Sequence, residues 1–178
     1  MGKIKKFIPL KLFCGIIFSN PDDLDNVKTK LEKKFKEIDY ISPIIDFNQT
    51  AYYEPEMGKN LKKAFFSFAK LIKPEDFYKA KIFSNRLEEQ YLINGKRLVN
   101  IDPGAVSAYS VMLLTSKNFF HRVPLRKGIY AELTLIWQNR AFQDLDWTYP
   151  DYKTKSYKDI LTEIRNQYMP EYQKIVKE

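Results

Sequence analysis

The chain has 178 residues, of which 44% are hydrophobic and 29% are charged, a composition typical of a globular protein with one domain over residues 1–178. Its single cysteine, Cys14, excludes an internal disulfide, and its single histidine excludes a zinc site built from Cys and His side chains. The net charge of +8 favours an anionic partner, although surface lysines can also serve only to keep a protein soluble.

No stretch approaches the ~20 apolar residues that a membrane-spanning helix needs, so we expect a protein that does not enter the membrane. Cys14 lies in the apolar run of residues 12–18, where a thiol most often behaves as a small buried side chain. A lone thiol of this kind is typical of a reducing compartment. We therefore expect a cytoplasmic protein that is a monomer or a weak dimer.

Residues 11–18 are rich in β-branched and aromatic side chains, which predicts a buried strand. A helix should follow, because Asn20 can cap it and Pro21 suits its first position. The apolar residues of this helix recur every three or four positions and form one stripe: Leu24, Val27, Leu31, Phe35 and Ile38. A strand at residues 40–47 completes a strand–helix–strand unit.

Residues 61–72 predict a further strand, and residues 74–91 allow two interpretations. The helical spacing of the apolar residues predicts one long helix over the whole segment. Alternatively, residues 81–83 are extended, and Asn85 with Glu88 forms a capping box that begins a shorter helix. We favour the shorter helix.

Asp102 follows a predicted strand at residues 97–101 and precedes Pro103 and Gly104, which we expect to end that strand. Its carboxylate is either a turn former that caps backbone amides or a group presented at the edge of the sheet.

Two strands at residues 109–116 and 128–137 should pair in antiparallel fashion, and a final helix should run over residues 156–176, kinked or ended by Pro170. Together these elements predict an α+β fold with a mostly antiparallel sheet and two or three helices. The strand–helix order suggests a ferredoxin-like core that the C-terminal strands and helix extend.

Two glutamates in the aromatic segment of residues 52–58, Glu54 and Glu56, lie two positions apart beside Tyr53. In an extended segment both carboxylates point the same way and can bind a hard cation such as Mg²⁺. The alternative is a surface turn with solvated acids.

Polar residues also interrupt two apolar segments near the C-terminal half of the chain. His121 is either a structural residue or a proton donor, and Arg122 beside it can grip a carboxylate or a phosphate. Glu132 lies in the middle of a predicted strand, opposite Leu133 and Leu135, where a carboxylate needs a partner. It either faces a polar pocket or forms a buried ion pair with an arginine, Arg97 or Arg122.

Basic residues are concentrated in two segments. Residues 59–97 hold ten Lys or Arg against four Asp or Glu, and residues 117–128, which include Lys117, hold no acid. Such an excess favours a phosphorylated small molecule or a nucleic acid. The aromatic run that begins at Trp147 either stacks on a base or packs against the final helix.

Several short motifs, taken in order, resemble the family of domains of unknown function numbered 4416 over roughly residues 8–168. The motifs are YYEPEMG at 52–58, Phe-x-Ser-Phe at 65–68, Ser-Asn-x-Leu-Glu at 84–88, VNIDPG at 99–104, HR at 121–122, GIYAELTL at 128–135 and WTYPDY at 147–152. The resemblance implies no particular activity.

The leading hypothesis is an enzyme or binding protein for a small phosphorylated ligand. Its expected proton-transfer residues are Glu132, His121 and Asp102. Its expected ligand contacts are Arg97, Arg122, Lys117, Tyr53 and Trp147. Magnesium would be held by Glu54 and Glu56. The rival hypotheses are an RNA- or DNA-binding module with a basic face and a non-catalytic scaffold.

Overall fold

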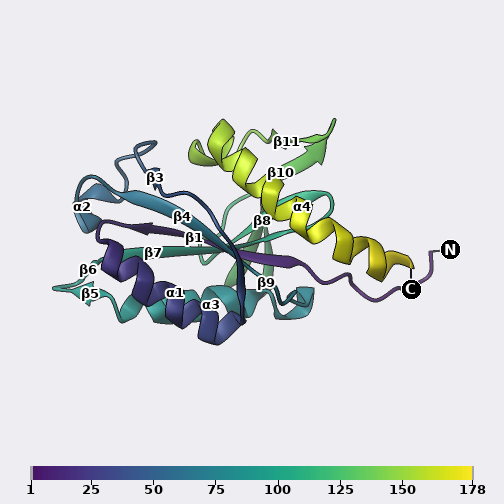
Figure 1. The fold of residues 1–178 in the computed structure, drawn as a ribbon, viewed down its shortest axis with the longest axis horizontal. Helices are drawn as coiled ribbons and strands as arrows, with labels where there is room; N and C mark the ends of the chain where they lie inside the picture. Colours follow the sequence, from purple (N-terminus) through teal and green to yellow (C-terminus); the bar gives the residue numbers. More distant parts are fainter. Residues whose placement is uncertain (1, 178) are drawn as a thin grey trace.

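The computed structural model describes residues 2–177, which form an α+β fold with a mostly antiparallel sheet of nine strands, as predicted (Figure 1). Within these residues there are four α-helices, three of them long. In chain order the elements are β1 Lys11–Phe18, α1 Pro21–Phe35, β2 Ile38–Ile41, β3 Ile45–Asp46, α2 Glu54–Met57, β4 Lys62–Phe68, the 3-10 turn η1 Pro74–Asp76, α3 Tyr78–Glu89, β5 Leu92–Ile93, β6 Lys96–Arg97, β7 Val99–Val106, β8 Ser110–Thr115, β9 Arg122–Arg126, β10 Ile129–Gln138, β11 Ala141–Asp144, the 3-10 turn η2 Asp151–Lys153 and α4 Lys155–Lys177.

The strands of the sheet lie in the order β11-β10-β8-β7-β1-β4-β2, with β3 beside β4 and β9 beside β10. Along the chain, β1, α1, β2, β4, α3 and β7 come in this order, with the short elements β3 and α2 before β4, and β5 and β6 before β7. In the sheet, the four strands lie in the order β7-β1-β4-β2. This β-α-β-β-α-β connectivity is that of a ferredoxin-like core. The strands β8 to β11 and the helix α4 extend it, as the sequence predicted.

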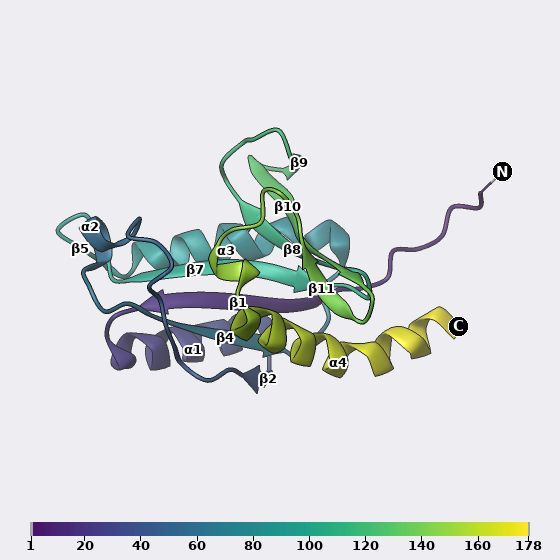
Figure 2. The same ribbon diagram turned by 90° about the horizontal axis from the view of Figure 1, so that it is seen from above.

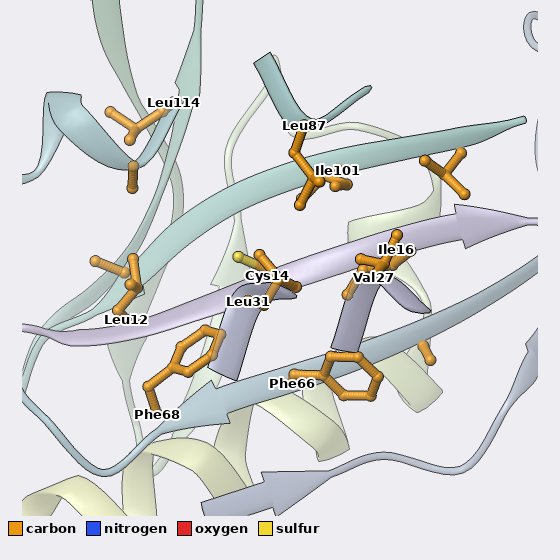
Figure 3. Packing of buried hydrophobic residues seen from close by; sticks show 14 of the residues in the cluster. Leu12, Cys14, Ile16, Val27, Leu31, Phe66, Phe68, Leu87, Ile101 and Leu114 are labelled. Carbon is orange, nitrogen blue, oxygen red and sulfur yellow. The ribbon is translucent and has the colours of Figure 1, made fainter. Parts of the chain in front are cut away.

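The helices cover opposite faces of the sheet: α1 and α3 lie on one face and α4 on the other (Figures 1 and 2). Because side chains alternate along a strand, β1 supplies both layers. Its residues Leu12, Cys14 and Ile16 pack under α1 and α3 (Figure 3), whereas Phe13 packs with Phe65 against α4. All eight residues of β1 are buried for this reason.

Helix α1 begins and packs as its sequence predicts. The side chain of Asn20 accepts a hydrogen bond from the backbone N–H of Asp22 at 3.1 Å, and Pro21 occupies the first turn. From the predicted apolar stripe, Leu24, Val27 and Leu31 are buried against the sheet. Each such burial stabilises the fold by about 1.5–3 kcal/mol.

The predicted short helix after an extended segment at residues 81–83 is wrong. Helix α3 runs without interruption over Tyr78–Glu89. Glu88 does not cap it, because its carboxylate instead accepts a hydrogen bond from the backbone N–H of Ile101 at 2.7 Å. The carboxylate of Glu88, which the local pattern assigns to a helix cap, therefore binds the distant backbone of Ile101 instead.

The prediction that Asp102-Pro103-Gly104 ends a strand is also wrong, since β7 runs through all three residues. Proline is tolerated in a strand where its missing N–H would face an unpaired edge. Gly104 lies directly opposite Phe13 on β1, whose ring occupies the space of a side chain at this position. Pro103 and Gly104, which together are typical of a turn, here belong to a closely packed strand.

Strand boundaries also differ from the sequence prediction: Ile38, expected on the first helix, begins β2, and β4 ends at Phe68, not at Ile72. The strand expected at residues 40–47 is divided into β2 and β3, and residues 42–44 between them belong to no strand. There the Ser42 hydroxyl accepts a hydrogen bond from the N–H of Phe65 on β4 at 2.9 Å. Pro170 does not end the last helix, which continues to Lys177.

We expect the substitution Gly104→Ala to lower the free energy of unfolding by about 1–3 kcal/mol. A Cβ atom at Gly104 would lie 2.4 Å from Cζ of Phe13 and 2.8 Å from the backbone oxygen of Met112, and the backbone cannot move aside cheaply. Urea denaturation measures the effect. Gly2→Ala is the control, since nothing lies within 4 Å of its Cβ position, and equal stability of the two variants would contradict the close packing.

Candidate functional site

A cavity of about 720 Å³ lies where the sheet divides between β7 and β8. The two strands pair only from Gly104 to Val106, whereas β7 pairs with β1 along its whole length and β8 pairs with β10 along its whole length. From Gly104 toward the N-terminal end of β7, the strands β8 and β10 therefore turn away from β7 (Figure 2). We call this space the β7–β8 cavity.

Side chains of α3 replace the missing strand partner of β7 at this division. The carboxylate of Glu88 accepts from the N–H of Ile101 at 2.7 Å, and Nζ of Lys81 donates to the carbonyl of Ile101 at 3.2 Å. Both side chains are buried and both line the cavity. Pro103, two residues along the same edge, has no N–H that requires a partner.

Asp102 lies at the centre of the cavity wall, in the interior of β7. Its Oδ2 accepts a hydrogen bond from Asn100 Nδ2 at 2.8 Å, and Nζ of Lys81 lies 3.6 Å from its Oδ1. The expectation that its carboxylate caps backbone amides of a turn is wrong. The side chain is 27% exposed, so the carboxylate is open to the cavity.

Arg97 lines the cavity and is held by two carboxylates. It binds Glu56 through two hydrogen bonds of 2.7 and 2.8 Å, and its Nη1 donates to Glu88 at 3.2 Å and to Asn100 at 2.9 Å. The hydrogen bonds from Arg97 lower the pKa of Glu56 below its ordinary value. The guanidinium is therefore fixed by protein groups on several sides.

Glu132 also lines the cavity, from β10, and is 1% exposed. Its Oε2 accepts from Arg122 Nε at 2.8 Å and lies 3.0 Å from His121 Nε2. Its Oε1 has no hydrogen-bond partner among the described residues. The sequence left open a polar pocket or an ion pair with an arginine, and the structure shows Glu132 in both settings.

A β-bulge on β10 makes this placement possible. Leu133 pairs with Met112 and Leu135 pairs with Val111, so Thr134 is an extra residue on β10. The sequence predicted that Leu133 and Leu135 share the face opposite Glu132. Instead Leu133 is 38% exposed and Leu135 is fully buried in the core under α4, because the bulge reverses the alternation.

His121 does not line the β7–β8 cavity but supports it through Glu132. Its ring stacks on Trp147 with a centroid distance of 5.1 Å and an interplanar angle of 12°. Its Nδ1 is buried and has no partner among residues 2–177. Trp147 itself lines a neighbouring aromatic pocket, not the cavity.

The sequence prediction missed a buried lysine in the cavity wall. Lys63 on β4 is 1% exposed, and its Nζ lies 3.0 Å from Asp151 Oδ2 and 4.9 Å from the ring centroids of Tyr152 and Tyr157. Aromatic faces and a carboxylate together compensate the charge of a buried ammonium group. Lys63 and Asp151 are 88 positions apart in the sequence, so no local pattern reveals this contact.

Two tyrosines of the cavity, Tyr53 and Tyr149, have raised pKa values. Burial raises the pKa values of Tyr53 and Tyr149 above the ordinary value, and nearby carboxylates raise them further. Tyr149 accepts a hydrogen bond from Arg122 Nη2 at 2.7 Å. Tyr152 is buried, and its hydroxyl has no partner within the described chain.

The structure brings together most of the residues that the sequence singled out. The cavity wall includes Glu132, Asp102, Arg97, Arg122, Lys117 and Tyr53. His121 joins this set through Glu132, and Glu56 joins it through Arg97. Glu54 is exposed and does not line the cavity.

The segment with Glu54 and Glu56 forms the one-turn helix α2, not the extended structure that would align the two carboxylates. Glu56 is committed to Arg97. Across residues 2–177, no group of three or more His, Cys, Asp or Glu side chains is placed to hold a metal ion. A role for these two residues in binding magnesium stays a prediction.

The fold and the cavity define a class of protein: a ferredoxin-like α+β fold with a charged cavity where its extended sheet divides. The model of the family described as a domain of unknown function (DUF4416) matches residues 8–168, and the chain belongs to this family, as its motifs predicted. Comparisons with curated proteins and with solved structures found no match. In the described part of the chain, no helix has the length and apolar character to cross a membrane.

We expect Glu88→Ala to lower the free energy of unfolding by about 2–3 kcal/mol, because the N–H of Ile101 loses its buried acceptor while Arg97 keeps Glu56. Glu89→Ala is the matched control, since it is exposed and adjacent on the same helix. Urea denaturation measures stability, and hydrogen exchange at the amide of Ile101 reports the local effect. Unchanged exchange there would contradict the role of Glu88 at the divided sheet.

Proposed function

We propose that this protein binds a small phosphorylated molecule in the β7–β8 cavity. The observation that carries the proposal is that two cationic residues, Lys117 and Arg122, line the cavity and contact each other. Lys117 is exposed and makes no ion pair within residues 2–177. Its backbone oxygen accepts a hydrogen bond from Arg122 Nη1 at 3.1 Å, so the two residues are neighbours in the cavity wall.

Arg122 retains hydrogen-bonding capacity for a ligand. Of the five N–H groups of a guanidinium, one donates to Glu132, one to the backbone of Lys117 and one to Tyr149. About two N–H groups remain, and a planar guanidinium matches the oxygen atoms of a phosphate group. The ammonium group of Lys117, which donates to the hydroxyl of Tyr52 at 3.1 Å, adds a second positive charge.

Two buried polar atoms of the cavity residues support a ligand with hydroxyl groups. Oε1 of Glu132 and the hydroxyl of Tyr152 have no partners among the described residues. A buried polar atom without a hydrogen bond costs about 1–3 kcal/mol. A phosphorylated molecule that also donates and accepts hydrogen bonds, such as a sugar phosphate or a nucleotide, would remove part of this cost.

If the protein is an enzyme, Glu132 and Asp102 are the proposed proton acceptors, since both carboxylates line the cavity. His121 would then act through Glu132 by holding Oε2, which leaves Oε1 for the ligand. Magnesium bound between a ligand phosphate and these carboxylates is a further part of the proposal. Both ideas rest on the position of the carboxylates.

Three basic residues in the cavity wall support a small ligand, whereas the other seven Lys and Arg of residues 59–97 lie outside the cavity. Of the ten Lys and Arg in residues 59–97, Lys63, Lys81 and Arg97 line the cavity. Each of the three also pairs with a carboxylate. A face that tracks an RNA or DNA strand needs these charges on an open surface.

We expect a sugar phosphate or a nucleotide to raise the melting temperature, with a gain that grows with ligand concentration. A screen of phosphorylated metabolites, with and without magnesium, measures this gain. Lys117→Ala should remove most of it, whereas Lys33→Ala, an exposed cation on α1, should not. Glu132→Gln should abolish any part of the gain that requires magnesium or a hydrogen bond to a carboxylate.

A salt titration of single-stranded RNA binding separates the rival function. A surface with six or more phosphate contacts loses about 10³-fold or more in affinity between about 50 and 200 mM salt. Binding of that kind, unaffected by Lys117→Ala, would replace the small-ligand proposal with a nucleic-acid module. If neither ligand class binds, a non-catalytic scaffold with a solubilising surface is the remaining function.

We further infer a cytoplasmic protein that is a monomer or a weak dimer. Cys14 is the only thiol, is fully buried on β1, and burial raises its pKa far above the ordinary value. Reducing agents should therefore leave the melting temperature and the molecular mass in solution unchanged. A reductant-dependent shift in either measurement would contradict a buried, unreactive thiol.

A further inference from the structure

An aromatic pocket of about 470 Å³ adjoins the β7–β8 cavity and shares two residues with it, Arg122 and Tyr149. The remaining wall is mainly aromatic and consists of Phe119, Phe120, His121 and Trp147 together with Asp146. The hydrogen bond of 2.7 Å between Arg122 Nη2 and the hydroxyl of Tyr149 forms the boundary between the two spaces. A molecule that crosses this boundary contacts both.

The aromatic side chains of this pocket form a platform that is exposed to solvent. Phe120 is 80% exposed and Phe119 is 56% exposed, although the chain has a well-formed core that buries most of its other phenylalanines. The Phe120 ring meets His121 at 4.8 Å and Trp147 at 6.2 Å, both edge-on. Contiguous exposed aromatic surface of this kind marks an interaction site.

The platform is held in place by the cavity. His121, which stacks on Trp147, is bound through its Nε2 to the buried carboxylate of Glu132. The indole N–H of Trp147 donates to the backbone oxygen of Leu133 at 2.7 Å. Because these contacts fix the rings of His121 and Trp147, a planar ligand would lose little free energy to ordering those two rings.

We infer that the ligand of this site is a nucleotide, whose base stacks on the aromatic platform and whose phosphate binds Lys117 and Arg122. The inference rests on the proposed function, because it uses the same phosphate-binding cations. Base stacking on aromatic side chains is favourable for every base, and the exposed carboxylate of Asp146 in the pocket wall can accept from base N–H groups. The nucleotide is either a free molecule or the 5′-terminal residue of a strand.

The test compares a nucleoside 5′-monophosphate with ribose 5-phosphate, which carries the same phosphate without the base. The nucleotide should bind about tenfold more tightly, equivalent to about 1.4 kcal/mol of stacking. Calorimetry measures both affinities. Phe120→Ala should remove most of this difference and leave ribose 5-phosphate binding unchanged, whereas Phe7→Ala, which truncates a ring that is 75% exposed on the N-terminal segment, should preserve it.

Tryptophan fluorescence gives a direct readout of stacking. The chain has two tryptophans, and Trp137 lies outside both pockets beneath the guanidinium of Arg165, at 3.9 Å from ring centroid to Cζ. In the Trp137→Phe variant, Trp147 is the only tryptophan. The nucleotide should then change the emission of Trp147 in proportion to binding, whereas ribose 5-phosphate should not.

The outcomes separate this inference from the proposed function. Equal affinities for nucleotide and ribose 5-phosphate, with no change in Trp147 emission, would overturn the nucleotide inference and leave the phosphate site intact. If neither molecule binds, both fail. A short oligoribonucleotide with a 5′-phosphate that binds more tightly than its 5′-hydroxyl form identifies a strand end as the source, and equal binding of the two forms contradicts it.

Discussion

The divided pairing of β7 is the constraint on which the rest of this structure depends. A strand that loses its neighbour exposes backbone N–H and C=O groups, which must find other partners when they are buried. Here Glu88 and Lys81 of α3 bind both backbone groups of Ile101, and Pro103 removes a donor from the same edge. The sheet can then open between β7 and β8 without the loss of buried hydrogen bonds at Ile101.

The same arrangement brings charge into the protein. Two charged side chains of α3 enter the cavity because they bind the backbone of β7. Each also forms an ion pair there: Glu88 with Arg97, and Lys81 with Asp102. Buried ion pairs contribute little net stability, because desolvation offsets most of their attraction. Their effect here is geometric, because the interlocked charges fix the cavity wall. Within residues 2–177, Lys117 is a cation of that wall that forms no ion pair.

Local sequence patterns predicted the elements well and their long-range contacts poorly. The stripe from Leu24 to Leu31, the cap at Asn20 and the ferredoxin-like order follow from periodicity and turn chemistry, which operate within a few residues. The Lys63–Asp151 pair and the use of Glu88 as a partner for β7 depend on residues that meet only after folding. The prediction for Asp102-Pro103-Gly104 was wrong for the same reason. Gly104 is required by the ring of Phe13 on β1, and Pro103 lies at the edge of β7 that has no strand partner.

The candidate site was partly predictable because buried charges interrupt apolar segments. Glu132 can be recognised in the sequence because it lies within an apolar strand, and Arg122 because it lies close to an aromatic pair. The structure places both in the cavity wall. The paired acids of residues 54 and 56 were less informative, since the direction of their side chains depends on whether the segment is extended or helical. Periodicity does not decide that question over four residues.

The bulge at Thr134 allows one strand to serve two different surroundings. Before the bulge, β10 presents Glu132 to a polar cavity, and after it the same face presents Leu135 to the apolar layer under α4. A one-residue insertion or deletion between them would turn one of the two side chains to the opposite face of the strand, so that Glu132 leaves the cavity or Leu135 leaves the apolar layer. This short stretch of β10 is therefore intolerant of changes in length, even though its neighbour Leu133 is open to solvent and free to vary in chemistry.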